Sequence, residues 1–212
     1  MLEVFHKETE MGVSDLARRL GLHKNNAFRL LATLELAGYI QQTPKTELYH
    51  LGPRCLELGH AFERSHSLID QARPLLEELA STVRETVHLG VLSPHDSHTP
   101  GNEVVHLDGV LPEQTVLTGL RVGTRTPAHC TALGKVLLAG AEFDLFEKTF
   151  ERFTDATRVD PAKLADEFRA VALQGYGADL EEYSAGLHCV AAPVRDASAR
   201  IVAAISLSGP SF

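Results

Sequence analysis

The sequence predicts an α+β protein with two domains, an N-terminal winged helix-turn-helix and a larger C-terminal domain with a mainly antiparallel sheet, joined by a linker helix. Two short segments with helical apolar spacing flank a glycine near the N-terminus, and two strand-like runs follow them directly. Helical and strand-like segments then alternate along the rest of the chain. We expect residues 1–52 to form the winged domain, 53–66 the linker helix and 67–212 the second domain.

The composition is that of a globular protein. The chain has 212 residues, of which 44% are hydrophobic and 23% charged. No apolar run reaches the roughly 18 residues that a membrane span needs, and the acidic start does not resemble a secretory signal. Cys55, Cys130 and Cys189 are an odd number without C-x-x-C spacing, so neither a disulfide framework nor a thiolate zinc site is expected. We therefore predict a cytoplasmic protein with no membrane contact and no cofactor.

The charge is divided unevenly along the chain. The net charge is −8, yet the first 65 residues hold eight basic and eight acidic side chains, so the whole deficit lies beyond them. A neutral N-terminal domain joined to an acidic one is compatible with a DNA reader and a separate sensor.

The segment 13–38 has the pattern of two short helices. Ser14 is a good N-cap for the first helix, whose apolar residues are Leu16, Ala17 and Leu20. Gly21 interrupts it, and a second helix is expected from His23 or Lys24 to a closing Gly38. Its inward positions are Ala27, Leu30, Leu31 and Leu34. This spacing is typical of a helix-turn-helix, although helical pairs without a DNA role share it.

Two β-type runs, 39–42 and 48–51, flank a turn and predict a hairpin or wing. In a winged helix the second helix enters the major groove and the wing lies along the DNA backbone, so outward side chains should be polar or cationic. The candidates for DNA contact are Lys24, Asn25, Asn26, Arg29, Thr33 and, on the wing, Lys45. Asn and Arg suit base edges and Lys suits phosphates. The alternative is an ordinary solvated helix face.

The second domain is expected to begin with helices. Pro53 occupies a favoured first helical position, which predicts the linker helix 53–66. Pro74 should break the helical pattern, so we expect the next helix over 74–85 with Leu75, Leu76 and Leu79 inward. The strand-like runs 87–93 and 103–110 should pair antiparallel.

The remaining elements alternate between strand and helix. We expect a strand over 113–119, a helix over 131–138, a polar helical region over 142–154 and a helix over 161–173 capped by Asp160. The runs 188–194 and 201–209 are apolar enough for central strands of one antiparallel sheet. A ligand would then lie between sheet and loops.

Taken along the whole chain, the sequence resembles the IclR (isocitrate lyase regulator) family of bacterial transcription regulators. The resemblance rests on VSDLARRLGLHKNNAFRLLATLELAGYI, YHLGPRCLELG, RPLLEELASTVRETVHLGVL, TPAHCTALGKVLLA, QGYGADLEEYSAGLHCVAAPV and AAISLSGP, in the family's order. It implies a GAF-like effector-binding domain after the winged helix, and homodimers or homotetramers on double-stranded operator DNA. It also implies that a small organic acid modulates operator binding.

The segment 127–138 carries a chemical argument of its own. Thr131 is a plausible N-cap, and the backbone N–H groups of Leu133, Gly134 and Lys135 would then face an anion. Ser206 and Ser208 lie two apart on a strand, so both hydroxyls face one side. The alternative is that both serines bond only to local backbone.

The resemblance assigns the effector pocket to specific positions. Its lining residues correspond to Ala132, Leu133, Asp179, Cys189, Ser206 and Ser208, and its wall to Thr115, Thr118, Thr126 and Leu187. Relatives that bind small carboxylates tend to be more apolar where the three threonines stand. We therefore expect a wetter pocket and a ligand with extra hydroxyl groups.

Two other function classes have candidate residues in this sequence. An enzyme could use Cys130 or Cys189 as nucleophile with His129 or His188 as base, but adjacent residues rarely reach one another in the required geometry. A metal-responsive regulator could use histidines of the second domain, although none shows clear ligand spacing. These histidines are His88, His95, His98, His106, His129 and His188.

Overall fold

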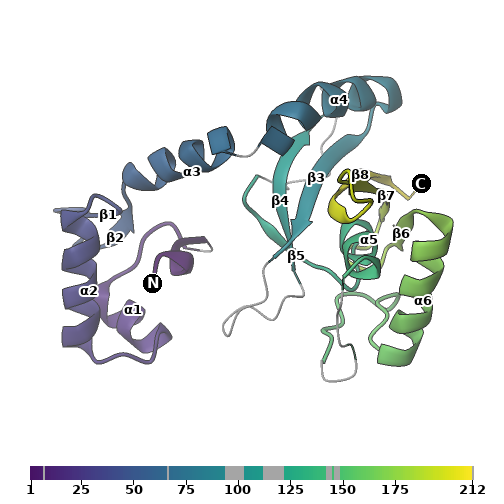
Figure 1. The fold of residues 1–212 in the computed structure, drawn as a ribbon. Helices are drawn as coiled ribbons and strands as arrows, with labels where there is room; N and C mark the ends of the chain where they lie inside the picture. The colour runs from purple at the N-terminus through teal and green to yellow at the C-terminus, as the bar shows by residue number, and fades with distance from the viewer. Residues whose placement is uncertain are drawn as a thin grey trace. The chain divides into compact units, whose positions relative to one another are not determined.

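A computed structural model of the chain describes residues 1–6, 8–65, 67–93, 103–111, 122–141, 145 and 149–211. The chain divides into two compact units, Met1–Ser67 and Leu68–Phe212 (Figure 1). Each unit has a hydrophobic core of its own. Among the described residues, no helix combines the length and apolarity needed to cross a membrane.

The N-terminal unit is a winged helix-turn-helix followed by one further helix. Its elements are the 3-10 helix η1 (Leu2–His6), α1 (Val13–Arg19), α2 (Lys24–Leu36), β1 (Ile40–Gln42), β2 (Tyr49–Leu51) and α3 (Arg54–Ser65). The two strands pair antiparallel as the predicted wing. Its core is entirely apolar or aromatic and consists of Val4, Phe5, Met11, Leu16, Leu31, Ile40 and Tyr49.

Two details of this unit differ from the sequence prediction. Helix α1 has Gly12 at its N-cap instead of Ser14, because the helix already begins at Val13. Leu30 is exposed, while Ala27 and Leu31 are fully buried. Residues four apart share a helix face, so the buried stripe of this short helix runs through 27 and 31 and leaves 30 beside it. Gly38 closes the helix as expected, with a φ of 80°.

The C-terminal unit contains a six-stranded sheet in the order β5-β4-β3-β8-β7-β6. Its strands are β3 (Thr86–Leu92), β4 (Glu103–Val110), β5 (Arg125–Pro127), β6 (Gly177–Leu180), β7 (Leu187–Arg195) and β8 (Ile201–Pro210). Every neighbouring pair is antiparallel. The helices are α4 (Ser67–Val83), α5 (Ala132–Ala139) and α6 (Pro161–Gln174).

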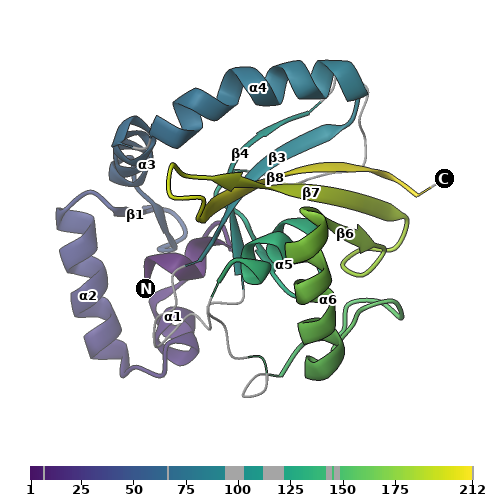
Figure 2. The same ribbon diagram turned by 45° about the vertical axis from the view of Figure 1, so that its right-hand side comes forward.

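The helices cover the two faces of this sheet (Figure 2). On one face, Ala72, Leu76 and Ala80 of α4 pack with apolar residues of β3, β4 and β8. On the other, α5 and α6 form the second core cluster with Val104, Ala191 and Ala204 of the sheet. Because side chains alternate along a strand, Val87 and Leu89 of β3 face α4, while Thr86 and His88 face the α5 side.

Several predicted boundaries in this unit were wrong. Pro74 lies inside α4, which begins at Ser67 instead of Pro74, because the buried stripe on both sides of the proline packs on the sheet and sustains the helix. That stripe places Leu76 inward and leaves Leu75 exposed. Leu145 and residues 149–154, the described part of the predicted region 142–154, are not helical, and the predicted strand 113–119 lies outside the described residues.

Candidate functional site

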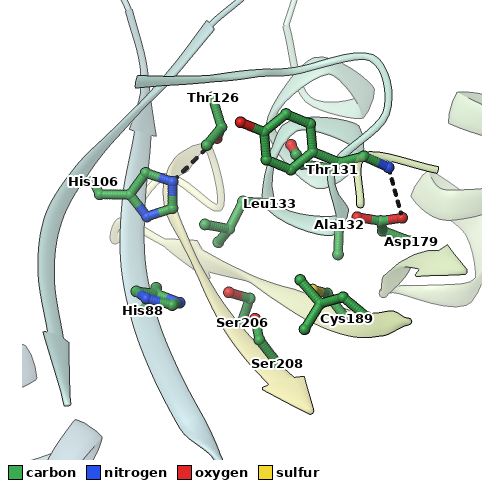
Figure 3. Close-up of a pocket in the computed structure, with 12 residues that line it drawn as sticks. His88, His106, Thr126, Thr131, Ala132, Leu133, Asp179, Cys189, Ser206 and Ser208 are labelled. Carbon is green, nitrogen blue, oxygen red and sulfur yellow. Dashed lines mark hydrogen bonds between the residues drawn. The ribbon is translucent and has the colours of Figure 1, made fainter. Parts of the chain in front are cut away.

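A cavity on the α5 side of the sheet collects polar side chains from all six strands (Figure 3). It is lined by His88, His106, Thr126, Thr131, Ala132, Leu133, Asp179, Tyr183, Leu187, Cys189, Ser206 and Ser208. Its volume is about 30 Å³, which is room for about two water molecules. The sheet positions most of these residues, and the N-terminal end of α5 closes the cavity.

The start of α5 is capped by its own sequence. The Thr131 hydroxyl accepts a hydrogen bond from the Gly134 N–H (3.3 Å) and donates to the Pro127 carbonyl (2.7 Å). The Lys135 N–H donates to the Thr131 carbonyl (3.0 Å). The expectation that Gly134 and Lys135 offer free N–H groups was therefore wrong, because the cap and the first helical turn use both. Helix geometry leaves Ala132 and Leu133, at the cavity, without an intrahelical acceptor.

A row of polar side chains crosses three adjacent strands. Asp179 of β6 pairs in register with Cys189 of β7, which pairs with Ser208 of β8. Ser206, two residues earlier on β8, pairs with His88 of β3. Ser206 and Ser208 therefore face the cavity side by side, as their spacing predicts. Burial raises the pKa of the Cys189 thiol to about 11, so this sulfur is a neutral wall atom at pH 7.

Asp179 holds the segment that follows β6. One of its carboxylate oxygens accepts the backbone N–H of Glu182 (2.7 Å) and that of Tyr183 (3.4 Å). Burial raises its pKa to about 6, against the opposing effect of these two donors and of Lys135. The Asp179 carboxylate therefore has a pKa about one unit below neutral pH. It lies at the edge of the cavity and holds the backbone of Glu182 and Tyr183 in place through these two hydrogen bonds.

Two histidines lie at the opposite side of the cavity from Asp179 (Figure 3). The rings of His88 and His106 meet edge to face, with centroids 5.2 Å apart. His106 Nε2 forms a hydrogen bond with the Thr126 hydroxyl at 3.1 Å. The His88 ring lies against Gly109, where a Cβ atom would come within 2.9 Å of it. Burial lowers the pKa of both histidines to about 4, so both are neutral at pH 7.

A buried charge cluster supports the cavity from behind α5. The ammonium group of Lys135, which is fully buried, donates to Glu167 (2.8 Å), to Glu182 (2.5 Å) and to the Ala178 carbonyl (2.8 Å). Arg158 adds a second cation beside Glu167. The cluster ties α5 to α6 and to the segment after β6, and so fixes the elements that carry Leu133, Asp179 and Tyr183.

All the side chains predicted to contact DNA are exposed to solvent. Those on α2 are Lys24, Asn25, Asn26, Arg29 and Thr33, and Lys45 is exposed in the turn between β1 and β2. The Thr33 hydroxyl donates to the backbone carbonyl of Arg29 at 2.9 Å. This hydrogen bond does not use the guanidinium group of Arg29. Within the described ranges, neither Arg29 nor the two lysines forms an ion pair, so these cations are available to a polyanion.

Eight of the ten predicted effector residues line the cavity. They are Thr126, Ala132, Leu133, Asp179, Leu187, Cys189, Ser206 and Ser208. The other two, Thr115 and Thr118, lie outside the described residues. Sequence reasoning missed Tyr183 and the pocket positions of His88 and His106, which it had weighed only as metal ligands. Alternation along 86–92 could have placed His88 on the face opposite Val87 and Leu89.

The two alternative classes find little support. Cys130 is fully buried, burial raises its pKa well above the usual range, and His129 Nε2 donates to the Glu151 carbonyl at 3.0 Å. No three ligand-type side chains gather as a metal site in the part of the chain that the structure describes. His95 and His98 fall outside that part.

Comparison with known proteins decides the family. The model for the IclR helix-turn-helix domain matches residues 1–44, and that for "Bacterial transcriptional regulator IclR C-terminal" matches residues 60–212. The chain belongs to the IclR family. It is similar to the HTH-type transcriptional regulator BhcR of Paracoccus denitrificans, with 34% identity over 100% of this chain and 75% of BhcR. XynR of Escherichia coli, also an HTH-type transcriptional regulator, is 35% identical over 98% of this chain and 82% of XynR.

A solved structure adds a ligand-bound relative. An IclR homologue from Microbacterium hydrocarbonoxydans, crystallised with 4-hydroxybenzoate, is 28% identical, with a TM-score of 0.80 over 95% of this chain and 82% of that one. The IclR-family protein described here is thus a transcriptional regulator, a non-enzymatic role, with a helix-turn-helix for DNA and a C-terminal effector domain.

Proposed function

We propose that a small organic acid binds in the cavity beside α5 and thereby changes the affinity of this IclR-family regulator for its operator. The observation that carries the proposal is the convergence of Ser206, Ser208 and the start of α5 on one buried cavity. The N–H groups of Ala132 and Leu133 and two hydroxyls supply donors for a carboxylate.

The cavity must widen to admit such a ligand. Its present volume of about 30 Å³ holds water only, whereas ligand pockets measure roughly 300–1,000 Å³. Binding therefore requires movement of lining side chains. A ligand that binds only the widened state shifts the protein toward that state, and this differential affinity is what an allosteric effector needs.

The DNA-binding part of the proposal assigns roles on the N-terminal unit. Asn25, Asn26 and Arg29 of α2 read base edges, while Lys24 and Lys45 contact phosphates and Thr33 lies at the protein–DNA interface. One winged helix covers a half-site, so binding to a roughly palindromic operator requires a homodimer or a homotetramer. Helix α3, which follows the wing, is the element we propose to carry the change from the effector domain.

Calorimetry tests the effector site. The best ligand from a thermal-shift panel of organic acids is titrated into the protein, the Ser206→Ala variant and the Ser198→Ala variant. Losing a charge-assisted hydrogen bond costs on the order of 1.5–3 kcal/mol, so Ser206→Ala should weaken binding roughly tenfold to a hundredfold. Ser198, exposed in the turn between β7 and β8, is the matched control and should have no effect.

Operator affinity without ligand should stay the same in both variants, because the substitution lies in the C-terminal unit. If Ser206→Ala and Asp179→Ala both bind the acid as tightly as the unmodified protein, the effector binds elsewhere. Ser206 and Ser208 would then have only a structural role in the sheet.

A further inference from the structure

One buried polar atom at the cavity has no partner within the described part of the chain. His106 is 4% exposed, and its Nδ1 atom makes no hydrogen bond there, although Nε2 is held by Thr126. Figure 3 shows this free nitrogen on the side of the ring toward His88. Buried polar atoms are almost always paired, so an unpaired one at a ligand cavity marks a position for a ligand atom.

The electrostatics of this end of the cavity decide which ligand group belongs there. Both imidazoles are neutral at pH 7, because burial lowers each pKa to about 4. No lysine or arginine is among the cavity's described lining residues, and Lys135 points away toward two glutamates. The other titratable lining groups are Asp179, Tyr183 and Cys189, none of them cationic. A ligand carboxylate at the histidine end of the cavity would have no positive charge to pair with. A neutral hydroxyl group can be bound there without one.

We propose that His106 binds a hydroxyl group of the effector, so that the pocket selects hydroxy acids whose hydroxyl lies at the end opposite the carboxylate. This inference rests on the proposed effector site and adds the ligand class. The carboxylate lies at the start of α5 with the serines. The hydroxyl lies at the His106 end of the cavity, within hydrogen-bond reach of Nδ1.

The hydrogen bonding of His106 is consistent with a hydroxyl partner in either tautomer. The Thr126 hydroxyl can donate to Nε2 or accept from it, which leaves Nδ1 as donor or acceptor respectively. A ligand hydroxyl can play either complementary part. A site built to bond a hydroxyl rejects the analogue that lacks it, because the buried nitrogen then remains unpaired.

Two matched pairs of acids test the inference without any mutation. Benzoate is compared with 4-hydroxybenzoate, and hexanoate with 6-hydroxyhexanoate, by calorimetry on the full chain at pH 7. In at least one pair the hydroxylated acid should bind about tenfold or more tightly. 4-Methoxybenzoate should lose this advantage, because its methyl group enlarges the end of the ligand that must fit beside the His106 ring.

Variants then assign the preference to the histidine. His106→Phe keeps a ring of similar shape but no nitrogen, so the preference for the hydroxylated acid should fall to about twofold or less. Thr126→Val retains the His106 ring and removes the group that orients it, so it should reduce the preference to an intermediate value. His188→Phe changes an exposed histidine of β7 and should leave the preference intact. Thermal unfolding of each variant confirms that it is folded.

The outcomes separate this inference from the proposed function. If acids bind and lose affinity in Ser206→Ala, but the two members of each pair bind equally, the hydroxyl role of His106 is overturned and the effector site stands. A preference that persists in both His106→Phe and Thr126→Val overturns it too. If no acid of either pair or of the wider panel binds, the proposed effector site itself is overturned.

Discussion

The two units of the molecule place their functional side chains in opposite environments. On the N-terminal unit, every candidate DNA contact is exposed and stands on a core of apolar and aromatic residues. In the C-terminal unit, six of the eight described candidate ligand contacts are buried, and the other two, Leu187 and Cys189, are half-buried. Every buried polar or charged side chain of the described residues belongs to this second unit. We therefore expect the candidate ligand contacts to contribute to both stability and recognition, and the candidate DNA contacts to contribute to recognition alone.

This difference has a thermodynamic consequence. Replacing an exposed cation removes no packing, so its effect should appear in binding and not in folding. Replacing a buried polar side chain leaves its partners unpaired, so its effect should appear in both. Three changes, from the largest expected effect to the smallest, test whether the two units differ in this way.

The largest effect is expected from Lys135→Met. The substitution leaves the buried Glu182 and the half-buried Glu167 with Arg158 as their only described cation. Breaking a buried ion pair by removing one partner costs about 3–5 kcal/mol. Denaturant unfolding followed by circular dichroism should show this loss in the free energy of unfolding of the C-terminal unit. Lys163→Met, on the exposed face of α6, is the control and should change stability by less than about 0.5 kcal/mol.

If both lysine variants are equally stable, the charge cluster does not stabilise the C-terminal unit. The expected difference between the two units, that buried polar side chains of the C-terminal unit contribute to stability, would then not hold for Lys135. A loss confined to the transition of the N-terminal unit would contradict the assignment as well.

The second effect is a dependence of stability on pH. His88 and His106 have a pKa of about 4 in the folded chain and about 6.5 when unfolded. The unfolded state therefore takes up protons first, so the stability due to each neutral histidine is complete above pH 6.5 and is lost as pH falls toward 4. Each contributes a slope of up to about 1.4 kcal/mol per pH unit within that window, or about 3 kcal/mol in all.

Asp179 acts in the opposite direction, because its raised pKa makes the folded state take up a proton near pH 6. The measurement is therefore a difference: unfolding of the unmodified protein and of His106→Phe is compared from pH 7.5 to 4. The variant should lose less stability on acidification. Parallel curves would mean that His106 does not titrate as a buried neutral group.

The same contrast explains what could be predicted from the sequence. Exposed and inward positions of α2 follow helical periodicity, so Arg29 and Ala27 could be placed from spacing alone. The hairpin 39–51 and the strands β7 and β8 were also predicted, because turn residues separate runs of strand-forming residues. These are local signals, and they extend over only a few residues.

The parts that escaped prediction depend on contacts between distant segments. Helix α4 continues through Pro74 because the sheet packs against both halves of it, which no local pattern records. The edge strand β6 has four residues and exists by pairing with β7. His106 lies at the pocket because β4 pairs with β3. Only the structure shows that Thr126 of β5 binds Nε2 of this histidine and leaves Nδ1 without a partner among the described residues.

The smallest effect should come from the N-terminal unit and should leave stability unchanged. Arg29→Ala should cost roughly 1–3 kcal/mol on the operator and reduce discrimination between operator and random DNA, because Arg can bind guanine through two hydrogen bonds. Lys45→Ala should weaken binding to all sequences similarly and lower the slope of log affinity against log salt by about 1, because we propose a phosphate contact for this lysine. Gel-shift titrations at several salt concentrations measure both quantities. Equal losses for Arg29→Ala on operator and random DNA would remove its base-reading role, and a lower unfolding midpoint for either variant would show that this exposed surface also stabilises the fold.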